Sequence, residues 1–252
     1  MREEAVALLR RGIPNRTVAE QFGIPRGTVA WWRHEDRRVR GETYSPPTDC
    51  PPCTGRDVHP SAYAYLLGLY LGDGHIISKP KQHHLSIFCD ASWSGLVDAA
   101  EEAMRLVMPL PRVSRRARKG CIEVKSHTHH WTCLFPQHGP GKKHERRIIL
   151  DGWQQEIVDA YPWEFIKGLI HSDGCRITNW TTRMVGGERK RYEYPRYFFT
   201  NKSDDIRRLC TDTLTKVGVE WTVLARGSDP FNVSIARKAS VALMDAHVGP
   251  KH

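Results

Sequence analysis

Residues 65–74 read YLLGLYLGDG, and residues 165–174 read FIKGLIHSDG. In each stretch the apolar run predicts a helix, a glycine lies at its middle, and Asp-Gly follows it. A glycine inside a helix costs about 1 kcal/mol relative to alanine, and a carboxylate at a helix C-terminus faces an unfavourable dipole. Because both costly features recur in the same register, we predict that Gly68 and Gly168 let two helices pack backbone to backbone.

Such packing would bring two acidic side chains together. Asp73 and Asp173 occupy equivalent places at the ends of the two predicted helices. Two carboxylates at close range repel each other and both stay ionised only with a cation between them, and hard divalent ions take oxygen ligands. The pair therefore predicts a site for Mg²⁺ or Mn²⁺. The structural alternative is that the glycines serve packing alone and that Gly74 and Gly174 simply end the helices.

Both stretches resemble the LAGLIDADG signature. The matching positions are Leu66, Gly68, Leu69, Asp73 and Gly74 in the first stretch and Gly168, Leu169, Ile170, Asp173 and Gly174 in the second. Lys167 and His171 depart from the signature, where apolar and acidic residues are typical. Two copies in one chain resemble the monomeric, two-motif form of the LAGLIDADG homing endonucleases, and the resemblance covers about residues 60–248.

This resemblance implies an α+β fold. Two αββαββα repeats related by a pseudo-twofold axis would place the motif helices at the centre and form a saddle of strands that binds double-stranded DNA. It also implies that Asp73 and Asp173 bind the catalytic divalent cations and that a basic residue lies near each scissile phosphate, for which Lys125 and Lys238 are the candidates. We expect a monomer, because the two copies already supply the twofold that single-motif relatives obtain by dimerising.

The order of the predicted elements repeats without use of the motif letters. After each motif helix we expect a hairpin, a helix and a second hairpin, and the last hairpin is followed by a helix. The predicted elements after the first motif are a hairpin around KPKQ (79–82), a helix at 93–108 and a hairpin from 112–118 to 121–127. Those after the second motif are a hairpin around MVGGERK (184–190), a helix at 204–218 capped by Ser203, a hairpin from 219–226 to 231–237, and a helix at 238–248.

Residues 1–36 form a predicted unit of their own. EEAVALLRRG, NRTVAEQFG and IPRGTVAWWRH each favour a helix, and glycine ends the first two. Short helices joined by a brief glycine turn are typical of a helix-turn-helix, whose third helix enters the major groove with its N-terminal residues leading. Arg26, Thr28 and Arg33 would then contact DNA. The alternative is a three-helix bundle without a ligand.

The remaining boundaries follow from composition. Residues 37–58 predict a proline-rich linker, residues 59–150 the first repeat and residues 151–252 the second. The linker contains Cys50-Pro-Pro-Cys53, which offers half of the four ligands of a zinc site. The other half could be Cys133 and His138, with His127, His129 and His130 as alternative ligands. The competing interpretation is a pair of reduced cysteines that bind nothing.

Charge points to a polyanionic partner. The 252 residues carry a formal net charge of +10, and basic residues cluster in RVSRRARKG (112–120), GKKHERR (141–147) and GERKRYEYPR (187–196). Such clusters suit phosphate contacts and make binding salt-dependent. The predicted contacts outside the first unit are Arg115, Arg116, Arg118, Arg189, Lys190 and Arg191.

Composition also bears on the compartment. The mean hydropathy is −0.52, and no apolar stretch has the length of about 20 residues that a membrane span needs. The seven cysteines are scattered through a chain whose charged N-terminus does not resemble a secretion signal. We therefore expect reduced thiols and a place in the cytoplasm, at the nucleoid.

Three functions remain open from the sequence. The first is metal-dependent double-strand cleavage of a long specific DNA site, as the resemblance to homing endonucleases implies. The second is transcription regulation by a helix-turn-helix protein whose LAGLIDADG fold has lost its chemistry; such regulators often lack one or both aspartates, and their helix-turn-helix follows the fold instead of preceding it. The third is an RNA-binding, maturase-like role, against which the helix-turn-helix argues because it suits duplex DNA.

Overall fold

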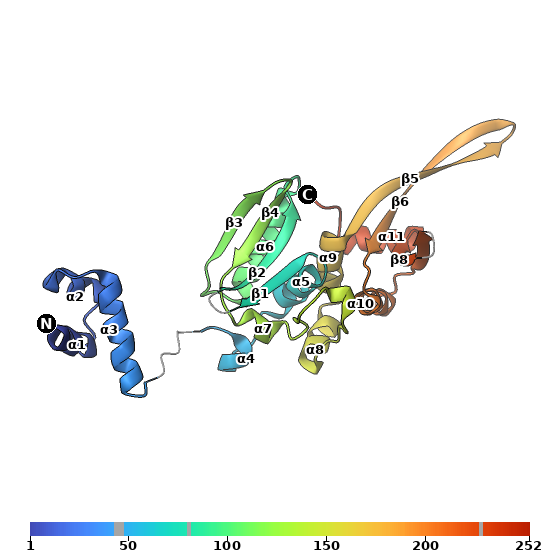
Figure 1. The fold of residues 1–252 in the computed structure, drawn as a ribbon. Helices are drawn as coiled ribbons and strands as arrows, with labels where there is room; N and C mark the ends of the chain where they lie inside the picture. Colours follow the sequence, from blue (N-terminus) through green and yellow to red (C-terminus); the bar gives the residue numbers. More distant parts are fainter. Residues whose placement is uncertain (43–47, 80–81, 227–228) are drawn as a thin grey trace. The chain divides into compact units, whose positions relative to one another are not determined.

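The computed structural model describes residues 1–42, 48–79, 82–226 and 229–252. Contacts within the chain divide it into two compact units, Met1–Pro47 and Thr48–His252 (Figure 1). Part of the predicted KPKQ turn falls outside the described residues. None of the helices in the described part of the chain combines the length and the apolar character that crossing a bilayer demands.

The first unit consists of three helices. They are α1 (Arg2–Arg10), α2 (Asn15–Phe22) and α3 (Arg26–Val39). A small core of Ala5, Leu9, Val18, Ala19 and Val29 holds them together. The third helix continues to Val39, beyond the predicted helix IPRGTVAWWRH (24–34) and the predicted end of the unit at residue 36, and ion pairs along its exposed side support the last turns.

The second unit contains the succession of helix, hairpin, helix and hairpin twice, and a further helix follows the second copy. The first set is α5 (Pro60–Leu71), β1 (Gly74–Lys79), β2 (Gln82–Asp90), α6 (Ser94–Val107), β3 (Val113–Arg118) and β4 (Cys121–Ser126). The second set is α9 (Pro162–Asp173), β5 (Gly174–Val185), β6 (Glu188–Thr200), α10 (Asp204–Lys216), β7 (Thr222–Arg226), β8 (Asp229–Ile235) and α11 (Lys238–His247). Both sheets are antiparallel, and their strand orders, β1-β2-β4-β3 and β5-β6-β8-β7, are equivalent. The predicted α+β fold with a duplicated repeat is confirmed.

Shorter elements flank the repeats. A one-turn helix, α4 (Pro51–Thr54), precedes α5, and α7 (Trp131–Leu134), the 3₁₀ turn η1 (Lys143–Glu145) and α8 (Gly152–Ala160) connect β4 to α9. Cys50 at the start of α4 is fully buried in the core of the second unit. The end of the predicted linker, from Thr48 onward, is therefore part of the second unit.

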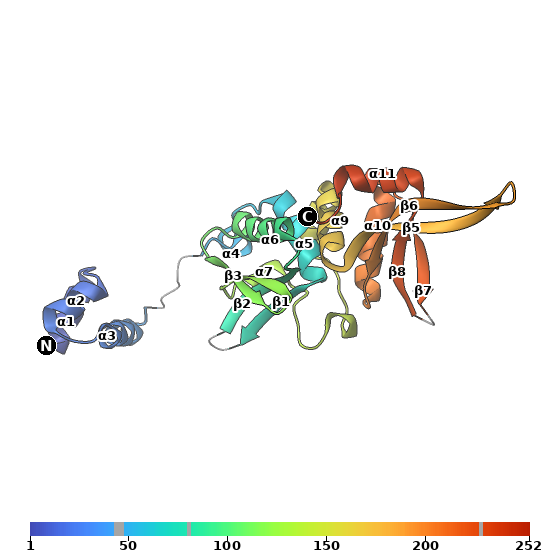
Figure 2. The same cartoon turned by 90° about the horizontal axis from the view of Figure 1, so that it is seen from above.

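The motif helices α5 and α9 form the centre of the second unit, between the two sheets (Figures 1 and 2). A Cβ atom placed on Gly68 would lie 2.6 Å from the Phe165 carbonyl oxygen, and one on Gly168 would lie 2.2 Å from the Tyr65 carbonyl oxygen. Real Cβ atoms do not approach backbone so closely, so any side chain at either glycine would push the helices apart. The glycine pair thus permits the backbone contact that we predicted.

The β5–β6 hairpin differs from our expectation. Gly186 and Gly187, with φ angles of +61° and +84°, form a two-residue turn, and strand continues on both sides of it. The predicted loop at 184–190 is therefore mostly strand, because Gly-Gly accommodates the backbone that tight hairpins need. The strand β6 pairs with β8 only at Tyr197–Thr200, so the outer part of the hairpin is a two-stranded ribbon that extends from the sheet (Figure 1).

Candidate nucleic-acid interface and carboxylate pair

The two signature aspartates lie at adjoining helix ends. The helix α9 ends at Asp173, and α5 ends two residues before Asp73. A Cβ atom on Gly72 would lie 3.2 Å from Cγ of Asp173 and 2.1 Å from Oγ of Ser172. The carboxyl group of the second motif therefore lies against the backbone of the residue that precedes Asp73 in the first.

The surroundings of both carboxyl groups disfavour negative charge. Burial raises the pKa of Asp73 to about 6, and the charge of Asp173 raises it as well. Burial also raises the pKa of Asp173, although Asn201 Nδ2 donates a hydrogen bond of 2.6 Å to its Oδ2 and opposes the shift. A cation beside the pair would reverse this effect, since an opposite charge favours the ionised form.

Two lysine side chains supply positive charge at this place. Lys143 Nζ donates to the carbonyl oxygens of Tyr70, Leu71 and Gly72 at 2.5, 3.0 and 2.7 Å. Lys251 Nζ donates to the Ser172 carbonyl at 3.0 Å. These carbonyls belong to helix ends, where the last carbonyls lack partners in the helix and the dipole is negative.

The same ammonium groups act on the carboxylates. The charges of Lys143 and Lys251 lower the pKa of both aspartates. In turn, burial lowers the pKa of Lys143 to about 8, against the charges of Asp173 and Asp73. Neither lysine was predicted to lie at this place, since each is more than 70 positions from the carbonyls it binds. Lys143 belongs to the predicted GKKHERR cluster, which is the one signal that the sequence offered.

The two lysines that were predicted to lie near the scissile phosphates, Lys125 and Lys238, belong to β4 and α11. Lys125 lies on β4, directly opposite Ser86 of β2, and its Nζ is 3.9 Å from Glu123 Oε1. Lys238 opens α11, as the helix predicted at 238–248 implies, and it is exposed. Arg237 before it is the N-cap of that helix.

Strand alternation sorts the basic residues of β3 into two faces. Arg115 pairs in register with the buried Val124, and it forms ion pairs with Asp98 and Glu101 of α6, so it lies on the helix-packed face. Arg116 and Arg118 alternate to the opposite face. There Arg118 forms a 2.8 Å ion pair with Glu123. The outer face of the first sheet thus carries two of the three predicted arginines.

The outer part of the β5–β6 hairpin combines basic and aromatic side chains. It carries the predicted residues Arg189, Lys190 and Arg191. Trp180 is 54 % exposed and Tyr192 is 45 % exposed, and the Arg191 guanidinium lies 5.0 Å from the centre of the Trp180 ring. Such mixed surfaces suit phosphates and bases, since cations bind phosphate and aromatic rings stack.

Closer to the sheet lies Arg196, which belongs to the basic cluster at 187–196 but was not among the predicted contacts. The guanidinium of Arg196 lies 4.6 Å from the centre of the Phe198 ring and donates to Ser234 Oγ at 2.5 Å. Arg196 and Lys190 alternate to the same face of β6.

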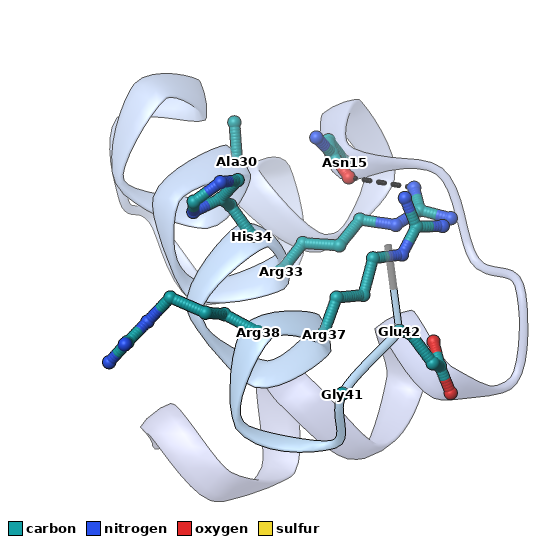
Figure 3. Close-up of a pocket in the computed structure, with 8 residues that line it drawn as sticks. All are labelled: Asn15, Ala30, Arg33, His34, Arg37, Arg38, Gly41 and Glu42. Atoms are coloured by element: carbon teal, nitrogen blue, oxygen red, sulfur yellow. Dashed lines mark hydrogen bonds between the residues drawn. The ribbon is translucent and has the colours of Figure 1, made fainter. Parts of the chain in front are cut away.

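In the first unit, basic side chains of α3 surround a recess of about 790 Å³ (Figure 3). Arg33 Nη1 donates to Asn15 Oδ1 at 3.0 Å, and Figure 3 draws the Arg33 and Arg37 guanidinium groups close together beside Asn15. Arg26 is exposed as the first residue of α3, and Thr28, two residues later, is half-buried. Arg33 is therefore fixed against α2, while Arg26 is accessible.

Comparison with solved structures shows which known fold the chain resembles. No protein-family model matches the chain, and no curated protein sequence matches it. The chain is similar to the crystal structure of I-DmoI in complex with DNA and Mn, with a TM-score of 0.50 and 14 % identity over 77 % of this chain and 98 % of that one. It is also similar to mesophilic variants of the homing endonuclease I-DmoI, with a TM-score of 0.51 and 14 % identity over 76 % of this chain and 91 % of that one.

A third similar structure is the N-terminal LAGLIDADG domain of DUF199/WhiA, with a TM-score of 0.46 and 12 % identity over 75 % of this chain and 83 % of that one. Two sheets of equivalent strand order, two glycine-packed helices that lead to aspartates, and the similarity to the homing endonuclease agree with one another. The second unit of this chain therefore has the two-repeat LAGLIDADG fold.

Proposed function

We propose that the protein binds double-stranded DNA and cleaves both strands at a long specific site with the help of divalent cations held by Asp73 and Asp173. The observation that carries the proposal is the carboxylate pair itself. Both groups lie at the ends of glycine-packed helices, and burial raises the pKa of each. A cost of this kind, repeated in both repeats, is explained by a bound cation.

The donor set suits the proposed metal. Two carboxylates beside helix-end carbonyls are oxygen ligands, which Mg²⁺ and Mn²⁺ prefer. Such a metal, when bound, would activate water and stabilise charge on the leaving oxygen of a phosphodiester. Asn201 would keep the Asp173 carboxylate oriented through its 2.6 Å hydrogen bond.

Other parts of the chain would hold the DNA. Arg116 and Arg118 on the first sheet, and Lys190 with its neighbours Arg189 and Arg191 on the β5–β6 hairpin, would contact phosphates. In the first unit, Arg26 at the start of α3 would contact bases, as in a helix-turn-helix. Lys125 and Lys238 remain candidates for contacts near the scissile phosphates. We propose that one copy of the chain suffices, because it contains both repeats.

A second candidate function is DNA binding without cleavage, as in a transcription regulator. The observation in its favour is the position of Lys143 and Lys251, whose charges lower the pKa of both aspartates. Two internal ammonium groups could stabilise the carboxylate pair without any metal. The pair would then be a structural element at the centre of the fold.

Cleavage of a plasmid that carries the protein's own genomic neighbourhood tests the two functions. We expect wild type with Mg²⁺ or Mn²⁺ to produce one double-strand cut, and we expect Asp73→Asn to bind the DNA but not to cut it. Asp212→Asn is the matched control, since Asp212 is exposed on α10. A wild type that binds DNA, never cuts it and shows no change in affinity with Mg²⁺ would establish the regulator instead.

A further inference from the structure

Four potential metal ligands converge at the edge of the first repeat, on α4 and α7. Their ligand atoms all lie within 4.8 Å of one another, and they belong to Cys50, Cys53, His130 and Cys133. Cys53 Sγ lies 3.7 Å from Cys133 Sγ and 3.3 Å from His130 Nδ1. Cys133 Sγ lies 3.9 Å from the same nitrogen.

The three separations among Cys53, His130 and Cys133 are within about 0.4 Å of those in a tetrahedral zinc site. With zinc–sulfur bonds of about 2.3 Å and zinc–nitrogen bonds of about 2.0–2.1 Å, tetrahedral angles place two sulfurs about 3.8 Å apart and sulfur and nitrogen about 3.5 Å apart. A disulfide needs a sulfur–sulfur distance of about 2.05 Å, and the three cysteines are free thiols. The cluster therefore has the spacing of metal ligands and not that of a covalent bridge.

The local sequence explains why the ligands converge. Each pair is spaced i, i+3 across one helical turn: the Cys53 amide donates to the Cys50 carbonyl at 3.1 Å, and the Cys133 amide donates to the His130 carbonyl at 3.0 Å. One turn of this kind places both side chains of a pair on the same side.

The turns themselves are fixed by burial. Cys50 and Trp131 are fully buried, and Trp131 Nε1 donates to the Ser126 carbonyl at 3.2 Å. Two anchored turns thus present their ligand atoms to each other before any metal binds.

We propose that Cys50, Cys53, His130 and Cys133 bind one Zn²⁺ ion as a structural site. Three thiolates and an imidazole favour zinc over the hard cations expected at the carboxylate pair. Four protein ligands leave no position for water or substrate, so the site stabilises structure and takes no part in cleavage. Its effect is to fasten the segment from Thr48 to Gly55 to the first repeat.

The structure also selects among the histidines that the sequence left open. His130 joins the cluster, whereas the pKa of His138 is lowered by burial and then by the charges of Arg146 and His75, so His138 has other neighbours. His129 is adjacent to His130 in sequence, and their ring centres are 4.0 Å apart. The choice follows from α7. His130 lies three residues before Cys133, so one helical turn brings their two side chains to the same side, whereas His129 lies four residues before Cys133.

Metal analysis of the full-length chain, purified without a histidine tag and without chelators, tests the proposal. We expect about one zinc ion per chain in wild type, as a closed four-ligand site requires. His130→Ala and Cys53→Ser should lower the zinc content at least tenfold. The matched controls His138→Ala and Cys121→Ser should keep it, and so should Asp73→Asn, which separates this site from the carboxylate pair.

Two measurements on wild type keep the test valid if a ligand variant does not fold. Cobalt added to the metal-free protein should give the visible absorption and thiolate charge-transfer bands of a tetrahedral site with three sulfurs. Bound zinc should also protect Cys53 and Cys133 from alkylation, while the exposed Cys175 reacts. The proposal is overturned if folded, reduced wild type takes up no zinc, or if His138→Ala loses the metal and His130→Ala keeps it.

Discussion

The two repeats agree at the centre of the fold and differ toward its edges. At the centre, Gly68 and Gly168 contact each other's helices in equivalent ways, and each helix leads to an aspartate. At the edges, β1 and β2 have 6 and 9 residues, whereas β5 and β6 have 12 and 13. The internal lysines differ as well, since Lys143 binds three carbonyls and Lys251 binds one.

This difference shows which features the pseudo-twofold constrains. Two helices that touch backbone to backbone share one interface, so a change in one glycine displaces both repeats. The strands and the lysines lie outside that interface, so the strand lengths and the lysine contacts can differ between the two repeats. We therefore expect substitutions at the centre to affect stability most and substitutions at the edges to affect ligand binding.

The strongest way to break the symmetric centre is Gly168→Ala. Its Cβ would lie 2.2 Å from the Tyr65 carbonyl oxygen, so the helices must separate. We expect the free energy of unfolding to fall by about 3 kcal/mol, at the upper end for overpacking. Gly152→Ala in α8 is the control and should change stability by less than about 0.5 kcal/mol, because nothing lies within 4 Å of its added Cβ. Similar values for both variants in chemical denaturation would show that the helices do not pack as described.

At the edges, neutralising the β5–β6 hairpin should weaken DNA binding more than neutralising the first sheet. We expect the triple variant Arg189→Ala, Lys190→Ala and Arg191→Ala to lower affinity about 10- to 100-fold and to reduce the slope of log K against log salt by about 2.7. The double variant Arg116→Ala and Arg118→Ala should lose less, since it removes two charges instead of three and since Arg118 pairs with the buried Glu123, whereas Arg191 pairs with the exposed Glu193. Affinity measured over a range of salt concentrations compares them, and an equal loss would mean that both repeats contribute alike.

The inequality of the internal lysines gives a smaller effect. Lys143→Met leaves three carbonyls without their donor and should cost about 2 kcal/mol of unfolding free energy, whereas Lys251→Met should cost about 1 kcal/mol. If the carboxylates bind metal, added Mg²⁺ should raise the free energy of unfolding of Lys143→Met more than that of wild type. Thermal denaturation with and without Mg²⁺ measures both effects. Equal costs for the two lysines would contradict the asymmetry.

The last effect appears only as the pH falls and concerns His171, which stands where the first motif has the buried Leu71. Burial, and then the charges of Lys167, Lys251 and His252, lower its pKa to about 3, and its Nδ1 lies 2.9 Å from the Tyr65 hydroxyl. Below about pH 6.5 the His171 imidazole binds a proton in the unfolded chain but stays neutral in the folded chain. The free energy of unfolding therefore falls as the pH falls.

The contribution of His171 alone to this loss should amount to about 1–2 kcal/mol between pH 7 and pH 5 in the metal-free protein. Asp73 acts in the opposite direction, because its pKa is raised to about 6 and its protonation stabilises the folded state as the pH falls. We expect His171→Leu to reduce the loss at pH 5 and Asp73→Asn to enlarge it, as denaturation at both pH values would show. An unchanged pH dependence in His171→Leu would mean that the histidine titrates normally.

The sequence predicted the centre of the fold better than its edges. The glycines and aspartates were predictable because each motif is one short continuous stretch of sequence and because the motif occurs twice in the same register. The length of the β5–β6 hairpin was not, since its outer strands are exposed on both faces and show no apolar alternation. Gly186-Gly187 was the available signal, and we interpreted it as part of a longer loop.

The ligand sets were harder to predict for a different reason. The contacts of Lys143 with α5 and of His130 with Cys53 join segments more than 70 residues apart. Sequence spacing predicted Cys50 and Cys53 as half of a zinc site, but the choice between His130 and His138 for the proposed site depends on how the chain turns after β4. Long-range placement of this kind follows from the packed core, and no local pattern encodes it.

The two-stranded ribbon also affects how the protein behaves at high concentration. From Ile177 to Arg196 the ribbon is described without a third strand beside it, so both of its edges expose backbone donors and acceptors. Open strand edges can pair with those of another molecule and begin aggregation. Here the positive charges of residues 189–191 make two such ribbons repel each other, and salt weakens that repulsion. The surface that we propose for DNA therefore also protects the free protein from self-association, and this protection should diminish as ionic strength rises.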